Sequence, residues 1–178
     1  SRTVVAEQFR IMRTNIKYMV NKVNKPVMLV TSSVSGEGKS FVATNFGAAL
    51  ALTGKKTVIL EFDIRKPRLL KGLDMQTQKG LSNFIIGKAT LDEILHSVPE
   101  FNSLFVIGCG PVPPNPSELL LDEQVALLFE ELKRRFDYII IDSAPVGLVS
   151  DAFTLSAYAD ASLYIVRHGY TLKRQLSM

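Results

Sequence analysis

Residues 33–40 read Ser-Val-Ser-Gly-Glu-Gly-Lys-Ser, and this stretch decides the fold. It follows an apolar run at 26–30 that is typical of a buried strand, and it precedes a helical pattern at 41–52. A strand, a glycine-rich turn and a helix in this order form a phosphate-binding loop, because backbone N–H groups and the helix N-terminus point at the anion. The loop departs from the usual pattern at Ser33, which stands where the first glycine is expected.

The last two side chains of this loop are suited to phosphate chemistry. Lys39 can neutralise the terminal phosphates of a nucleotide, and the Ser40 hydroxyl can ligate Mg²⁺. We therefore expect a nucleotide and its metal ion at this loop. The residues predicted to contact the nucleotide are Ser35, Gly36, Glu37, Gly38, Lys39, Ser40 and Phe41.

Two further strands are predicted to end in carboxylates. The run at 57–63 carries Glu61 and Asp63 on the same side of a strand by period-two geometry, and the run at 138–142 closes on Asp142. In an open parallel α/β sheet, ligands bind at the carboxyl ends of the strands. We expect Asp63 and Asp142 to meet Lys39 and Ser40 there, with Ser40, Asp63 and Asp142 around the metal. The alternative is that both aspartates are turn formers or helix caps.

The composition is that of an ordinary globular domain. With 178 residues, of which 47% are hydrophobic, the chain can bury one substantial core, so we expect a single domain over 1–178. A single cysteine excludes an intrachain disulfide and is consistent with a reducing cytoplasm. No apolar run approaches the roughly 18 residues that span a bilayer, so a soluble chain is expected.

Predicted helices and strands alternate along the chain. Strands are expected at 26–31, 57–62, 103–108, 137–142 and 161–166, and helices near 39–53, 80–97 with a break at Gly87, 117–135 and 150–158. This alternation predicts a three-layer, doubly wound, mostly parallel α/β sheet of the P-loop NTPase type. Residues 171–178 look like the start of another helix, and we expect the native protein to extend beyond Met178.

Residues 1–25 are predicted to form a basic amphipathic helix. Its six basic residues are opposed only by Glu7. Such a segment can lie near an anionic membrane or nucleic acid, or it can be a solvated helix face, which we favour. Glu7, Arg10 and Arg13 share one side of the helix and could form a row of salt bridges. Basic clusters at 65–68 and 133–135 lack interleaved aromatic residues, so no nucleic-acid partner is expected.

Five segments together resemble one family. Residues 35–40, 60–67 and 140–145 look like the three Walker-type motifs of bacterial tyrosine kinases, the BY-kinases associated with capsule and exopolysaccharide export. Residues 110–120 resemble a segment typical of that family, and residues 7–13 match its E-x-x-R-x-x-R oligomerisation motif.

The departures from related patterns are informative. Val34 stands where partitioning and cell-division ATPases carry a signature lysine, which disfavours that branch. Glu61 stands where the kinases usually have the first of two aspartates. The C-terminal tyrosine cluster of the family is missing, and the solitary Tyr170 is interpreted as a structural or exposed tyrosine.

The resemblance implies an autophosphorylating protein tyrosine kinase that uses ATP and Mg²⁺. Lys39 would stabilise phosphate charge, Asp142 would position the metal, and Asp63 would accept the tyrosine proton or orient the hydroxyl. The alternative is a MinD/ParA/Mrp-like ATPase that acts as a hydrolytic switch or scaffold.

The resemblance also implies partners and a location. Glu7, Arg10 and Arg13 would dock on a neighbouring copy in a homo-oligomeric ring, and tyrosine-bearing tails would be the substrate. A membrane-spanning adaptor, fused or separate, would hold the domain at the cytoplasmic side of the bacterial inner membrane.

Overall fold

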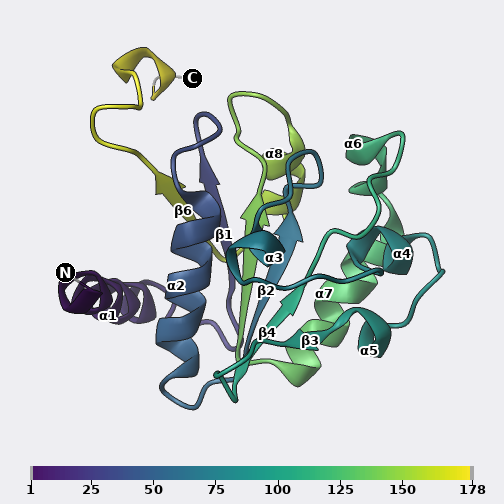
Figure 1. The fold of residues 1–178 in the computed structure, drawn as a ribbon, viewed down its shortest axis with the longest axis horizontal. Helices are drawn as coiled ribbons and strands as arrows, with labels where there is room; N and C mark the ends of the chain where they lie inside the picture. The colour runs from purple at the N-terminus through teal and green to yellow at the C-terminus, as the bar shows by residue number, and fades with distance from the viewer. Residues whose placement is uncertain (1, 177–178) are drawn as a thin grey trace.

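Six strands form one sheet at the centre of the computed structural model, which describes residues 2–176 (Figure 1). The strand order is β3-β4-β2-β5-β1-β6, and every neighbouring pair is parallel except β3 with β4. The strands are β1 (Val27–Ser32), β2 (Thr57–Phe62), β3 (His96–Ser97), β4 (Leu104–Ile107), β5 (Tyr138–Ser143) and β6 (Ala161–Ile165). The predicted fold class, a mostly parallel α/β sheet, is confirmed.

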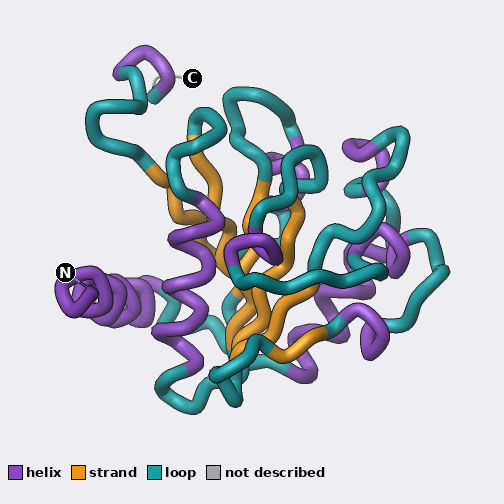
Figure 2. The backbone as a smooth tube through the Cα atoms, in the orientation of Figure 1, coloured by secondary structure: helices purple, strands orange, loops and turns teal. Residues whose placement is uncertain are grey.

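Helices cover both faces of this sheet (Figure 2). The longest three are α1 (Arg2–Met19), α2 (Lys39–Ala51) and α7 (Glu123–Arg135). The shorter ones are α3 (Leu69–Gly72), α4 (Leu81–Ile85), α5 (Leu91–Ile94), α6 (Pro116–Leu119), α8 (Asp151–Ser156) and the 3₁₀ turn η1 (Lys173–Gln175).

The alternation of side chains along the strands divides the core into two clusters. In β1, Val27 and Leu29 pack with buried residues of α4, α5, α7 and α8, whereas Met28 and Val30 pack with those of α1, α2 and α3. Such residues are buried on both faces of the sheet, and each contributes roughly 1.5–3 kcal/mol to folding. The central strands are therefore fixed in register and cannot slip by one residue without exchanging the two clusters.

The segment 80–97 differs from its predicted helix. Two short helices, α4 and α5, flank Gly87, whose φ of 72° is left-handed, and the segment then ends in strand β3. The β3 strand pairs antiparallel with β4 through His96 opposite Val106. The prediction missed it because two residues are too few to show a period-two pattern.

Two other helix predictions need correction. The helix expected over 117–135 is divided, because Asp122 caps α7 by accepting a hydrogen bond from the Gln124 N–H at 2.9 Å. The α-helix expected over 171–178 is wrong where the structure describes it, since only the 3₁₀ turn η1 forms. Positions 177–178, like Ser1, lie outside the described residues.

The basic N-terminal segment forms the helix α1, which ends at Met19 and is therefore shorter than the helix predicted over 1–25. Phe9, Ile16 and Val20 are buried against α2 and the sheet, so the apolar face of this helix belongs to the core. Within residues 2–176, no helix is both long and apolar enough to cross a membrane.

Candidate active site

The turn between β1 and α2 has the backbone of a phosphate cradle. Gly36 and Gly38 adopt φ angles of 88° and 101°, in the left-handed region where a side chain would cause strain. The first helical hydrogen bond of α2 runs from the Val42 N–H to the Gly38 carbonyl at 2.9 Å. The N–H groups before Val42 therefore have no helical partner and are available to an anion.

A cleft of about 220 Å³ opens at this turn. It joins the β1–α2 turn to the segment that follows β2, which lie far apart in the sequence. Its lining consists of Ser35, Gly36, Gly38, Lys39, Ser40, Phe41, Asp63, Lys66 and Arg68. The structure thus brings Asp63 beside the phosphate-binding loop.

Asp142 at the end of β5 is the most unusual polar residue of the site. It is fully buried, and within residues 2–176 neither of its carboxylate oxygens has a hydrogen-bond partner of ordinary geometry, although the Ser40 hydroxyl lies close by. Burial raises the pKa of Asp142 to about 7, although the neighbouring Ser40 hydroxyl and the Lys39 ammonium act to lower it. A buried carboxylate left unpaired in this way fits a bound cation.

The residues at this point fit a magnesium ion. The Ser40 hydroxyl and the Asp142 carboxylate place hard oxygen atoms side by side. The Asp63 carboxylate lies close enough to raise the pKa of Asp142, and both carboxylates interact with the charge of Lys39. Within the described residues, no cluster of three or more His, Cys, Asp or Glu forms a complete metal cage. A site with few protein ligands suits Mg²⁺, because this ion usually binds one or two carboxylates and completes its coordination shell with phosphates and water.

Lys39 lies among the carboxylates of the site. It is only 6% exposed, and this burial lowers the pKa of its ammonium, while Asp63, Asp142 and Glu37 raise it. Burial likewise raises the pKa of Asp63, which the Lys39 charge opposes. Asp63 also accepts a hydrogen bond from the Lys66 N–H at 3.2 Å, so its side chain is oriented.

Glu61 has a different role from its neighbour Asp63. Its carboxylate accepts hydrogen bonds from the Leu69 N–H at 2.6 Å and from the Cys109 N–H at 3.3 Å, and it does not line the cleft. Glu61 therefore ties β2 to the start of α3 and to the chain after β4. This explains how glutamate can stand where an aspartate is usual in the kinases that the sequence resembles.

Glu37, predicted to contact the nucleotide, turns its side chain to the protein. Its carboxylate accepts a hydrogen bond from the Val34 N–H at 2.8 Å and another from the Thr171 hydroxyl. It is absent from the lining of the cleft. Only the backbone of Glu37 remains a candidate for nucleotide binding.

A C-terminal strap, residues 164–171, holds the phosphate-binding loop from outside. The Tyr164 hydroxyl is hydrogen bonded to the Ser33 hydroxyl at 2.7 Å. Arg167 donates to the Gly36 carbonyl at 2.8 Å, and the Tyr170 hydroxyl donates to the Ser35 carbonyl at 3.0 Å. Tyr170 is thus a structural residue, and it remains half exposed.

Sequence reasoning missed the strap and the two cations of the cleft. The sequence analysis treats Lys66 and Arg68 only as part of a basic cluster without interleaved aromatic residues, although their position just after Asp63 places them at the carboxyl end of β2. The strap follows β6, which pairs in parallel with β1 and therefore ends beside the phosphate-binding loop. This position in the chain is the signal from which the strap could have been predicted.

The family of the chain is shown by its matches. Residues 28–165 match the CobQ/CobB/MinD/ParA nucleotide binding domain. The chain is 35% identical over 171 residues to "Tyrosine-protein kinase YwqD" of Bacillus subtilis, covering 96% of this chain and 71% of that protein. It is 38% identical over 167 residues to "Tyrosine-protein kinase CpsD" of Streptococcus agalactiae, covering 92% and 70%. The chain belongs to this nucleotide-binding family and, within it, to the bacterial tyrosine-protein kinases.

Other relatives are longer. "Tyrosine-protein kinase ptk" of Acinetobacter johnsonii is 33% identical over 98% of this chain, but the chain spans 24% of that protein. "Putative tyrosine-protein kinase CapB" of Staphylococcus aureus is 36% identical over 85% of this chain, which spans 66% of its length.

Solved structures agree with this placement. The kinase domain of the Escherichia coli tyrosine kinase ETK superposes with a TM-score of 0.92 at 27% identity, over 97% of this chain and 67% of that one. The chimerical protein CapA2B2 gives 0.90 at 33% identity, over 96% and 74%. The septum site-determining protein MinD of Pyrococcus horikoshii gives 0.67 at 20% identity, over 80% and 58%, and shows the shared fold alone.

Replacement of Asp142 by asparagine tests whether this carboxylate is kept for a ligand at the expense of stability. The pKa of Asp142 in the folded protein, about 7, lies above its value in the unfolded chain, so the folded protein holds the proton more tightly. The free energy of unfolding therefore falls as pH rises from about 4 to 7. We expect Asp142→Asn to raise the free energy of unfolding at pH 8, by up to about 4 kcal/mol. Urea unfolding at pH 5 and pH 8 measures this.

The same Asp142→Asn protein should lose Mg²⁺-dependent nucleotide binding. A variant that is less stable than the wild type at pH 8, or that binds Mg-ADP normally, would contradict the assignment of Asp142.

Replacement of Thr171 by valine tests the strap. The variant keeps the shape of the side chain but removes the hydroxyl, which donates to Glu37 and accepts from the Arg167 N–H at 2.9 Å, so one anchor of the loop is lost. We expect the dissociation constant of Mg-ADP to rise about tenfold, as the loss of one hydrogen bond to a charged group allows. Isothermal titration calorimetry measures it, and Thr171→Ser should bind as the wild type does. Equal binding by both variants would mean that the strap does not position the loop.

Proposed function

We propose that the chain transfers a phosphoryl group from Mg-ATP to the hydroxyl of protein tyrosines, including those of its own copies. Its relatives named tyrosine-protein kinases, at 35% and 38% identity, support this activity. The name of one relative, "Putative tyrosine-protein kinase in cps region" of Klebsiella pneumoniae, places that protein in a cps region. We accordingly propose a role in capsule or exopolysaccharide synthesis and export.

The observation that carries the proposal is the unpartnered, buried Asp142 beside Ser40 and Lys39. A structural aspartate at a strand end would be expected to cap a helix or a turn, and Asp142 accepts no such bond. Its environment instead fits the metal of a bound nucleotide, whose divalent charge would neutralise the γ-phosphate as the phosphoryl group leaves.

The side chains of the cleft would then have different roles in the reaction. Lys39 and the N–H groups at the start of α2 would hold the charge of the β- and γ-phosphates, with Ser40 and Asp142 keeping the metal in place. A tyrosine hydroxyl has a pKa of roughly 10, so its proton must leave during the attack. Asp63 is the candidate to accept that proton, because burial raises its pKa and so makes it a stronger base than a free aspartate.

An ATP-hydrolysing switch of the MinD/ParA/Mrp type would use the same cleft with water as the acceptor. Val34 in place of a signature lysine disfavours that branch. The two functions differ in the fate of the phosphoryl group, so the product identifies which one operates.

Replacement of Lys39 by methionine tests the proposed site. We expect the variant to remain folded, since methionine fills a similar volume, and to lose phosphotyrosine formation by at least about a hundredfold through lost charge stabilisation. Incubation with Mg-ATP and a tyrosine-bearing tail, followed by phosphotyrosine detection, measures this. Lys88→Met, at an exposed lysine outside the cleft, is the matched control.

A folded Lys39→Met protein with near-normal phosphotyrosine formation would refute the site. ATP consumption by the wild type without any phosphotyrosine would favour the hydrolytic switch.

Oligomerisation is proposed through the motif at 7–13. Glu7 and Arg10 form an ion pair of 2.9 Å on the exposed side of α1, where a second copy can reach them. Arg13 is instead committed to its own chain, because its guanidinium donates to the Ala49 carbonyl of α2 at 2.7 Å. In the proposed ring, Glu7 and Arg10 would meet the neighbour, while Arg13 would brace α1 against α2.

The remaining partners follow from the family. We propose that a membrane-spanning adaptor, fused or separate, holds this domain at the cytoplasmic side of the bacterial inner membrane.

A further inference from the structure

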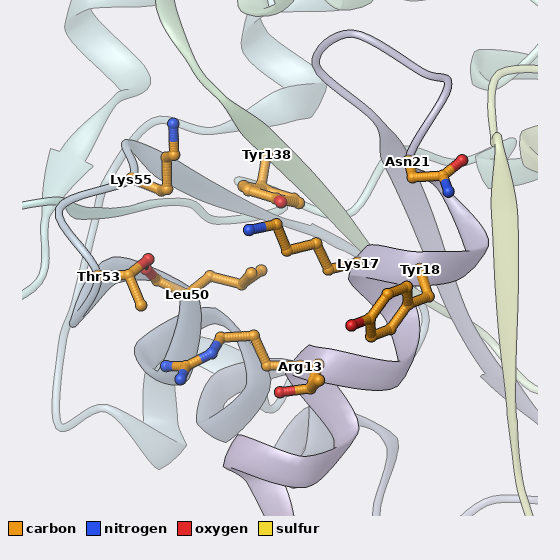
Figure 3. A pocket seen from close by; sticks show the side chains of 9 residues that line it. Arg13, Lys17, Tyr18, Asn21, Leu50, Thr53, Lys55 and Tyr138 are labelled. Atoms are coloured by element: carbon orange, nitrogen blue, oxygen red, sulfur yellow. Dashed lines mark hydrogen bonds between the residues drawn. The ribbon is translucent and has the colours of Figure 1, made fainter.

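A basic pocket lies between α1, the C-terminal end of α2 and the start of β5 (Figure 3). We define it by Arg13, Lys17, Tyr18, Leu50, Lys55 and Tyr138, which surround a space of about 610 Å³. Small-molecule sites typically enclose about 300–1,000 Å³. The pocket is therefore large enough for a compact ligand.

Positive charge is uncompensated in this pocket. Arg13, Lys17 and Lys55 line it, and among the residues that the structure describes no aspartate or glutamate does. The side-chain ammonium groups of Lys17 and Lys55 have no hydrogen-bond or ion-pair partner within residues 2–176, whereas Arg13 donates one N–H to the Ala49 carbonyl at 2.7 Å and keeps its other donors. Figure 3 shows the Lys17 ammonium turned into the space beside Tyr138. Arg13 and Lys17 are four residues apart on α1, a spacing at which like charges destabilise a helix unless an anion lies between them.

The nearest acidic group has its own partner. Asp137, next to Tyr138, accepts a hydrogen bond from the Lys56 N–H at 2.9 Å. It contributes to raising the pKa of Tyr138, after the larger effect of burial, so the Tyr138 hydroxyl stays protonated and can donate to an anion. The charge balance of the pocket thus favours a ligand that brings its own negative charge.

The basic pocket is separate from the candidate active site. Lys55 precedes β2 and Tyr138 begins β5, whereas Asp63 and Asp142 lie at the opposite ends of these two strands. The strands run in parallel, so the two sites occupy opposite edges of the sheet. A ligand in the basic pocket can therefore bind while the phosphate-binding loop holds a nucleotide.

We propose that the basic pocket binds a phosphate-bearing anion that carries a flat ring. The Lys17 ammonium, which is turned into the space, holds the phosphate, and Arg13 adds the guanidinium N–H groups that it does not donate to Ala49. The flexible Lys55 side chain turns inward from the rim to complete the contacts. The ring lies in the remaining space against the aromatic faces of Tyr18 and Tyr138, above the buried Leu50. Phosphorylated aromatic side chains and nucleoside monophosphates both belong to this chemical class.

Phenyl phosphate, a dianion with one ring, is the probe that tests this site. We titrate it into the ¹⁵N-labelled chain with saturating Mg-ADP, so that the loop is already filled. We expect the largest amide shifts at Lys17, Tyr18 and Lys55. The dissociation constant should rise about tenfold or more in Lys17→Gln and in Lys55→Gln, as the loss of one charged contact allows.

Lys88→Gln is the matched control, because it removes the same charge from the segment between α4 and α5, away from α1 (Figure 1). It should bind phenyl phosphate as the wild type does. Shifts confined to residues 35–41, or equal weakening by Lys88→Gln, would overturn the proposal. The loop shifts on adding Mg-ADP alone report separately on the proposed function, so either site can fail without the other.

Discussion

The burial of an unpaired carboxylate is the constraint on which the rest of this structure depends. Asp142 is fully buried, and neither of its carboxylate oxygens is hydrogen bonded to any residue in the described part of the chain. Burial of an unpaired charged group lowers the free energy of unfolding, and the raised pKa of Asp142, about 7, reflects the same unfavourable burial of its charge. Proteins retain such groups at functional sites, where a ligand offsets the cost. Ser40 and Lys39, at the start of α2, lie where that ligand would bind.

The topology of the sheet places Asp142 beside the phosphate-binding loop. The strands β1, β5 and β2 are adjacent and parallel, with Val30 of β1 opposite Asp142 and Asp142 opposite Glu61 of β2. Their carboxyl ends therefore meet at one edge, where the loop, Asp63 and Asp142 gather. Apolar residues on both sides of each strand fix this register, because a slip by one residue would send buried side chains to the wrong layer.

Much of this arrangement could be predicted from the sequence. The glycine-rich turn and the two strand-end aspartates are local patterns, and the parallel sheet places them together by a general rule. The partners of Glu61 could not be predicted, because they are backbone N–H groups of Leu69 and Cys109, remote in the chain. The strap was missed for the same reason. Contacts such as that of Thr171 with Glu37 depend on the tertiary structure and produce no periodic pattern in the sequence.

The most direct measurement of the central claim locates the metal itself. Crystals of the chain grown with Mn²⁺ in place of Mg²⁺ and a non-hydrolysable ATP analogue would give an anomalous difference map. The account predicts one strong peak in contact with the Ser40 hydroxyl and within a ligand or a water molecule of Asp142 and Asp63. A nucleotide bound at another place on the chain, or a peak remote from Ser40 and Asp142, would contradict it.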